Sequence, residues 1–116
     1  MTPPDPLRLA LNAITTRKLT LAQAIEGCAR HGIRGITVWR DRLQEMGIPA
    51  AVQSLKAHGL AVTGLCRGGM FPAADAAGRK AAIEDNLRAI DEAQAIGASC
   101  LILVVGGLPQ IGRAHV

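Results

Sequence analysis

Apolar and polar residues follow one another along the chain in blocks that are typical of alternating strands and helices. Four runs rich in Val, Ile, Leu and Ala predict strands, and they cover residues 7–14, 34–39, 61–66 and 99–105. The last run contains "LILVV" with no polar residue in it. Such a run favours a strand that is buried on both faces, as strands of parallel sheets are.

Three amphipathic stretches lie between these runs and predict helices. Their apolar stripes consist of Leu21, Ile25 and Cys28 in the first, Ile48, Val52 and Leu55 in the second, and Ile83, Leu87, Ile90 and Ala93 in the third. Thr20 and Gln23 have the spacing of a capping box before the first helix. Pro49 suits the first turn of the second helix. We therefore expect helices that each bury one face against the strands.

The third predicted helix also carries charged residues at positions opposite its apolar stripe. Glu84, Arg88 and Glu92 repeat at i, i+4 spacing, which is typical of a solvated helix face. Every predicted helix ends at a glycine, a residue that tolerates the left-handed backbone conformation of a helix stop; these glycines are Gly32, Gly59 and Gly97.

The alternation of strands and helices predicts an α/β fold with parallel strands joined by right-handed crossovers. No G-x-G-x-x-G follows the first strand, so a dinucleotide-binding sheet is disfavoured. An eight-stranded barrel fits better, but a whole barrel takes about 250 residues. We predict a truncated (β/α)8 TIM barrel: its first four parallel strands, in the order 1-2-3-4, with three helices on one side, a half barrel.

Composition and charge exclude several functional classes. The 116 residues carry a formal net charge of +4 that is spread along the chain, whereas a nucleic-acid-binding protein would cluster its positive residues. Three cysteines without a C-x-x-C pair argue against a disulfide framework or a structural zinc site. Neither a signal peptide nor an apolar run long enough to span a membrane is found. We expect a cytoplasmic, soluble protein that binds neither nucleic acid nor membrane.

Candidate site residues follow from the rule that a parallel barrel has its active site at the carboxyl ends of the strands. In "LCRGGMFP", the planar fork of Arg67 could hold a phosphate or carboxylate, or pair with a carboxylate of a neighbouring strand. Cys66 is either a nucleophile or a small apolar residue of the wall. The second interpretation is favoured, because no histidine lies near Cys66 in the sequence.

Two further strand ends offer polar or flat side chains. In "TVWRD", Trp39 is either a core residue or a flat wall against the face of a sugar. Arg40 either binds an anion or forms a local surface ion pair with Asp41. Asp41 is also a possible base. Asn12, near the end of the first strand, could bind a substrate hydroxyl or hold a loop. Because no H-x-H, H-E-x-x-H or carboxylate cluster is found, these residues alone do not define a reaction.

Two long segments nevertheless resemble a known family. These are "LALNAITTRKLTLAQAIEGCARHGIRGITVWRD" and "VTGLCRGGMFPAADAAGRKAAIEDNLRAIDEAQAIGASCLILVVGGLP". They resemble the N-terminal half of the sugar phosphate isomerase/epimerase family, within the xylose isomerase-like TIM barrel superfamily. The resemblance covers roughly residues 7–109, within the segment 1–109 that we treat as one domain, and "GLCRGGMFP" and "LVVGGLP" are its most specific parts.

The resemblance implies a chemistry for the full-length parent protein. Members bind a divalent metal, Mn or Mg, through two Glu, an Asp and a His of later strands, and they isomerise or epimerise a small sugar or sugar-like acid through an enediol. None of those ligands has a counterpart here, so we expect no metal on this fragment. What carries over is a set of pocket-wall positions that would contact substrate, namely Asn12, Trp39, Arg40, Cys66 and Arg67. An endonuclease IV-like phosphodiesterase and a non-catalytic fragment are the alternatives.

The end of the chain leads to two further expectations. The tail "IGRAHV" can be encoded by the start of a common short-read sequencing adapter, so we interpret residues 110–116 as a non-native tail produced by adapter read-through. A half barrel would also leave its first and fourth strands as open edges. We therefore expect a catalytically inactive fragment that self-associates through its exposed edge strands.

Overall fold

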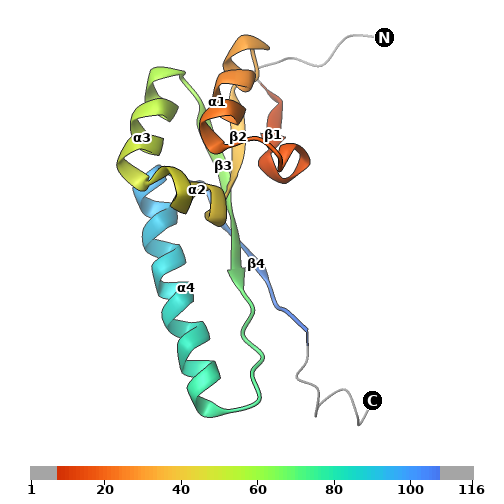
Figure 1. Cartoon of the computed structure of the whole chain (residues 1–116), viewed down its shortest axis with the longest axis vertical. Helices are drawn as coiled ribbons and strands as arrows, with labels where there is room; N and C mark the ends of the chain where they lie inside the picture. Colours follow the sequence, from red (N-terminus) through yellow and green to blue (C-terminus); the bar gives the residue numbers. More distant parts are fainter. Residues whose placement is uncertain (1–7, 108–116) are drawn as a thin grey trace.

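The computed structural model describes residues 8–107, and in them four parallel strands form one sheet in the order β1-β2-β3-β4. The elements in chain order are β1 (Ala10–Asn12), the 3-10 helix η2 (Ala13–Thr16), α1 (Leu21–Arg30), β2 (Gly35–Trp39), α2 (Arg40–Met46), α3 (Ile48–Ala57), β3 (Ala61–Gly69), α4 (Ala76–Ile96) and β4 (Leu101–Val104). Figure 1 shows the long helix α4 running alongside β3 and β4. The predicted truncated barrel is confirmed.

Helices pack on one face of the sheet because strand residues on that face are apolar. Ile36 and Val38 of β2 and Leu65 of β3 are completely buried in the core. The helices contribute Leu21 and Ile25 from α1, together with residues of α2, α3 and α4. The capping box predicted for α1 is present, as is the early proline of α3.

The largest differences from the sequence-based prediction concern two strands and one helix. β1 ends at Asn12 because the Asn12 side chain accepts a hydrogen bond from the Ile14 amide and starts the 3-10 turn η2. β3 continues to Gly69, because the chain keeps pairing with β4 across a bulge. The helix α2 was not predicted, since its seven residues are too few for a clear apolar period.

The buried face of α4 was predicted wrongly. Ile83, Leu87 and Ile90 are more than half exposed, whereas Ala93 of the predicted stripe is buried. The buried face of the helix consists of Asn86, Ala89, Ala93 and Ile96. Small residues on this face let the helix approach the strands closely: a Cβ on Gly68 would lie 2.8 Å from the Asn86 Oδ1 atom. The large apolar residues therefore point elsewhere.

Two sequence-based predictions lie partly or wholly outside the described residues. The interpretation of residues 110–116 as an adapter-derived tail concerns residues that the structure does not describe. Within residues 8–107, no helix combines the length and the apolar content needed to cross a bilayer.

Candidate functional site

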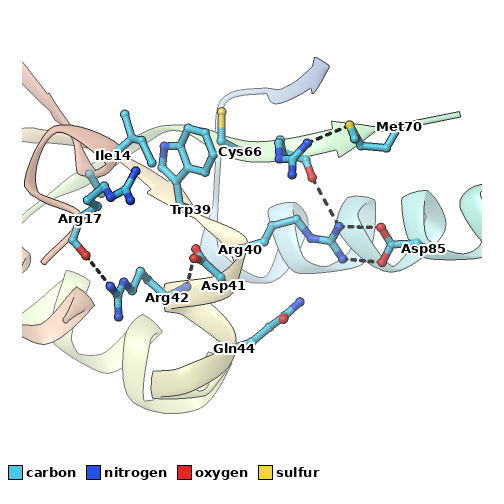
Figure 2. A pocket seen from close by; sticks show the side chains of 12 residues that line it. Ile14, Arg17, Trp39, Arg40, Asp41, Arg42, Gln44, Cys66, Met70 and Asp85 are labelled. Atoms are coloured by element: carbon cyan, nitrogen blue, oxygen red, sulfur yellow. Dashed lines mark hydrogen bonds and ion pairs between the residues drawn. The ribbon is translucent and has the colours of Figure 1, made fainter. Parts of the chain in front are cut away.

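A cavity of about 580 Å³ opens where the carboxyl ends of β1, β2 and β3 meet α2 and α4 (Figure 2). We call it the carboxyl-edge pocket. Its lining consists of Ala13, Ile14, Arg17, Trp39, Arg40, Asp41, Arg42, Gln44, Cys66, Arg67, Met70 and Asp85. Four of the five residues predicted for the site belong to this lining, namely Trp39, Arg40, Cys66 and Arg67.

Asn12, the fifth predicted residue, does not line the pocket but fixes the orientation of Trp39. Its Oδ1 atom accepts a hydrogen bond from the indole Nε1 of Trp39 at 2.8 Å. The same oxygen accepts the Ile14 amide at 3.2 Å, so one side chain holds both the loop after β1 and the indole at the end of β2. The polar edge of the indole is thereby satisfied, and its flat apolar surface remains on the pocket wall.

Arg40, the first residue of α2, forms ion pairs with two carboxylates of α4. Its Nε donates to Glu92 at 2.9 Å, and its two terminal nitrogens donate to Asp85 at 2.9 and 3.1 Å. A further bond reaches Glu92 at 3.1 Å, and the last reaches the carbonyl oxygen of Arg67 at 3.4 Å. All five guanidinium N–H groups of Arg40 are thus used within the protein.

This network corrects two interpretations of the sequence. Arg40 does not pair locally with Asp41, whose Oδ1 instead accepts the backbone amide of Arg42. Glu92 does not belong to a solvated face, since its side chain is only 12% exposed and pairs with Arg40. The reason is that α4 crosses the start of α2, which places acidic residues of one helix beside the first residue of the other.

The charges of the network shift its titration. Hydrogen bonds to Glu92 and then to Asp85 raise the pKa of Arg40 above its ordinary value. The hydrogen bonds from Arg40 lower the pKa of Asp85. Both groups are therefore held in their charged forms, and Arg40 has neither a proton nor a donor to offer a ligand.

Cys66 and Arg67, adjacent at the end of β3, differ in environment. Cys66 is 5% exposed, and burial raises the pKa of its thiol. The neutral form is thereby favoured, which fits a wall residue better than a nucleophile. Arg67 is exposed, and its Nη1 donates to the Met70 sulfur at 2.8 Å.

Gly69, the last residue of β3, is held by the side chain of Asn86 of α4. The Asn86 Oδ1 accepts the Gly69 amide at 2.5 Å, and its Nδ2 donates to the Gly69 carbonyl at 2.8 Å and to Ala82 at 2.8 Å. Gly69 has φ of +94°, a conformation suited to glycine. A buried side-chain amide thus fixes the backbone that carries Arg67 and Met70.

Sequence reasoning missed several pocket residues, chiefly Arg17, Arg42, Met70 and Asp85. Arg17 follows the end of β1 closely, so it obeys the same carboxyl-end rule as Asn12, although it lies beyond the strand itself. Met70 lies inside the "LCRGGMFP" stretch from which Cys66 and Arg67 were predicted. Asp85 had no such signal, because it comes from the middle of a helix.

The described residues do not contain a metal centre of their own. No group of three or more His, Cys, Asp or Glu side chains in residues 8–107 could hold a metal ion. Asp85 of the pocket lining and Glu92 outside it both form ion pairs with Arg40. The donor set does not fit the divalent metal that the resemblance implies, and we derive no step through such a metal in this chain.

Comparison with known proteins identifies the family of this half barrel. The family model described as "Xylose isomerase-like TIM barrel" matches residues 25–115. The chain belongs to the xylose isomerase-like TIM barrel family. Among curated proteins, none matches the chain.

A solved structure matches nearly all of the chain. The crystal structure of protein SMc04130 from Sinorhizobium meliloti 1021 is 46% identical, with a TM-score of 0.87 over 96% of this chain. The match covers 42% of that protein, so this chain spans less than half the length of its solved relative. The carboxyl-edge pocket lies at the edge of the barrel where strands end, which is where active sites lie in this fold.

Proposed function

We propose that this chain supplies the substrate-contacting wall of an isomerase or epimerase that acts on a small sugar or sugar-like acid. The proposal rests on one observation above all: in a xylose isomerase-like half barrel, a fixed indole and exposed arginines line a pocket at the carboxyl edge of the strands. A flat apolar surface beside charged donors suits a sugar, which has an apolar ring face and a polar rim.

The pocket residues receive different roles in this proposal. Trp39 covers the apolar face of the sugar, and Cys66 closes the wall beside it. Arg67 contacts a polar or anionic substituent. Asn12 and Arg40 act as positioning residues, because the first holds the indole and the second holds the backbone of Arg67.

The metal-dependent chemistry of the proposal belongs to the whole protein rather than to this chain. A divalent metal, Mn or Mg, would polarise the sugar carbonyl in the longer protein. Because residues 8–107 lack a suitable donor set, we propose that the chain on its own is inactive.

Proton transfer next to a sugar carbonyl can be followed without knowing the product. A fusion of residues 1–107 with the remaining part of the S. meliloti relative is incubated in D2O with Mn or Mg and a panel of triose to hexose sugars, their phosphates and keto acids. We expect deuterium to replace the hydrogen on the carbon beside the carbonyl of at least one compound, as seen by proton NMR. The unmodified relative is the control for folding.

The Trp39→Ala version of the fusion tests the assigned wall. It should fold like the parent fusion but show a higher KM, because an interaction with the sugar face is lost while the proton-transfer groups remain. If the relative and the fusion exchange no hydrogen in any compound, the proposed isomerase function is wrong.

A further inference from the structure

Three large apolar residues of α4 form a stripe that is more than half exposed. These residues are Ile83, Leu87 and Ile90. They repeat at i, i+4 and i+7, so they lie on one side of the helix. Single exposed apolar residues are common on protein surfaces, whereas a continuous apolar patch marks a contact surface.

The stripe lies on the flank of α4 that faces away from α2. Asp85 and Glu92 pair with Arg40, the first residue of α2. With 3.6 residues per turn, these two acidic residues and the apolar stripe occupy opposite flanks of the helix. The face between the two flanks packs on the sheet through residues such as Asn86 and Ala89. One flank of α4 therefore has a neighbouring helix, and the other has none among residues 8–107.

The strand β4 continues this apolar surface. In the described sheet, β4 pairs with β3 alone (Figure 1). The exposed Leu103 of β4 reaches back toward α4, since a Cβ on Gly68 would lie 2.9 Å from Leu103 Cδ2 and 2.8 Å from Asn86 Oδ1. On the helix surface Asn86 adjoins Ile83 and Ile90, at i−3 and i+4. We therefore group four residues as the α4–β4 face, namely Ile83, Leu87, Ile90 and Leu103.

Two acidic residues border this face on its outer side. Glu84 and Asp91 are exposed, and they adjoin Leu87 at i−3 and i+4. Within residues 8–107, neither of them takes part in an ion pair. Charges at the rim of a contact surface favour partners of the opposite sign. A fitting partner therefore has large apolar side chains at its centre and basic side chains at this rim.

The connection rule for parallel strands indicates which segment occupies the face. A right-handed crossover after β4 places the next helix on the same side of the sheet as α4, beside the apolar flank and over Leu103. The S. meliloti relative is long enough to contain this helix, because the chain covers only 42% of it. A second copy fits less well. If its β1 paired with β4, its first helix α1 would pack on its own β2 and leave the face open.

We propose that the α4–β4 face binds the helix that follows β4 in the longer protein. This helix is amphipathic, with large apolar side chains toward Leu87 and basic side chains toward Glu84 and Asp91. The inference concerns packing and is independent of the isomerase proposal. Where the helix is absent, as in the isolated chain, the face is free to contact another copy.

Thiol labelling measures whether the face is covered. Cys28 and Cys66 are buried and Cys100 is exposed, so Cys100→Ser gives a background of slow thiol reactivity. Leu87→Cys and Arg88→Cys are made in this background, both in the chain alone at low concentration and in the fusion of residues 1–107 with the remaining part of the relative. We expect a maleimide to react with Leu87→Cys about tenfold or more slowly in the fusion, because the docked helix must open first.

Arg88→Cys is the matched control, because Arg88 is the next residue and is exposed outside the face. It should react at the same rate in the chain and in the fusion. Equal rates for Leu87→Cys in the two proteins, or equal protection at both positions, would overturn the proposal. Protection that fades when the fusion is diluted would assign the face to a second copy and would also overturn it. The same labelling at the aligned position of the intact relative does not depend on the folding of the fusion.

A charge reversal tests the basic rim of the partner helix. Asp91→Lys should lower the Tm of the fusion by a few degrees and leave the Tm of the chain alone unchanged, because only the fusion contains the opposing basic residues. Glu26→Lys, at an exposed position of α1, changes the net charge equally and should affect both proteins alike. An unchanged or raised Tm of the Asp91→Lys fusion, or an equal decrease in the chain alone, would contradict the proposed charge of the helix.

Discussion

At the scale of single residues, the guanidinium of Arg40 joins three parts of the chain that are far apart in sequence. It pairs with Asp85 and Glu92 of α4 and donates to the carbonyl of Arg67 at the end of β3. The Arg40 side chain is only 11% exposed. A charge so far removed from water would be costly without these partners. The position of the pocket wall therefore depends on Arg40, although this arginine has no free N–H group left to bind a ligand.

Replacing Arg40 should destabilise the fold strongly. Arg40→Ala leaves Glu92 nearly buried without its partner, and we expect a loss of about 3 kcal/mol in the free energy of unfolding. Urea denaturation followed by circular dichroism measures this. Arg88→Ala is the control, because Arg88 is exposed and its pair with Asp85 is 3.4 Å long. An exposed pair of this kind should contribute only about 0.5 kcal/mol. Equal losses in both variants would contradict the assigned role.

The same network makes stability depend on pH. Arg40 lowers the pKa of Asp85 in the folded state, so the unfolded chain binds its proton at a higher pH than the folded chain does. The stabilisation is complete above the ordinary Asp pKa and is lost as pH falls through the lowered folded value. Asp85→Asn should therefore show a smaller loss of urea-denaturation midpoint between pH 5 and pH 3 than the parent chain. A parallel decline in both would contradict the pairing.

Residues of the site could be predicted from the sequence only where they follow directly on a predicted strand. The carboxyl-end rule located Trp39, Cys66 and Arg67 at the pocket, because a parallel sheet brings its strand ends to one edge. It could not provide the partners of Arg40. Those partners lie on α4, and the angle at which a helix crosses another element depends on side-chain packing rather than on local pattern.

At the scale of elements, α4 shows why an apolar period can predict a helix and still assign its buried face wrongly. The helix has two apolar faces, one of small residues around Ala89 and one of large residues around Leu87. The face of small residues packs on the sheet, since Gly68 and Asn86 approach each other closely there. Periodicity alone gave more weight to the large residues, which are exposed in this chain.

The contact between α4 and the end of β3 can be tested through Asn86. Asn86→Ala removes both bonds to Gly69 and leaves a buried amide and carbonyl without partners. The expected cost is about 2 kcal/mol in the free energy of unfolding. The Gly69 amide should then exchange with solvent faster in hydrogen-exchange NMR. Leu87→Ala, one position along the helix and exposed, should leave that amide protected. Unchanged protection in Asn86→Ala would show that the end of β3 is held by other contacts.

At the scale of the whole molecule, the chain exposes more apolar surface than one folded unit needs. Besides the large residues of α4, Leu103 of β4 and the following Val105 are 56% and 66% exposed. Open strand edges and broad apolar patches promote association. The solved relative is more than twice as long as the part of it that this chain matches, and its remaining length offers material that could cover these surfaces.

We therefore expect the isolated chain to associate with a second copy. Light scattering should give a mass above that of one chain, and Leu87→Lys with Ile90→Lys should lower it because charges then replace the apolar stripe. Glu84→Gln with Gln94→Lys changes the net charge equally at exposed polar positions of the same helix and serves as the control. A monomeric parent chain, or an equal decrease of the measured mass in the control, would contradict association through the exposed apolar residues of α4.

The overall fold was more predictable than its details. Strand order, parallel pairing and the half-barrel class followed from the alternation of strand and helix patterns, because that alternation permits few topologies. The short helix α2 and the end of β1 at Asn12 did not follow from it. The end of β1 depends on a single side-chain hydrogen bond, and α2 is too short to show a periodic pattern of apolar residues.

We propose that this chain supplies the substrate-contacting wall of a barrel whose remaining part supplies the proton-transfer chemistry. The most direct measurement mixes the chain with the separately expressed remainder of the S. meliloti relative, and follows Mn- or Mg-dependent deuterium exchange into a substrate of the intact relative. We predict that neither part exchanges hydrogen alone and that the mixture does. Deuterium exchange by either part alone would contradict this proposal. So would a mixture that exchanges no hydrogen under conditions in which the intact relative does.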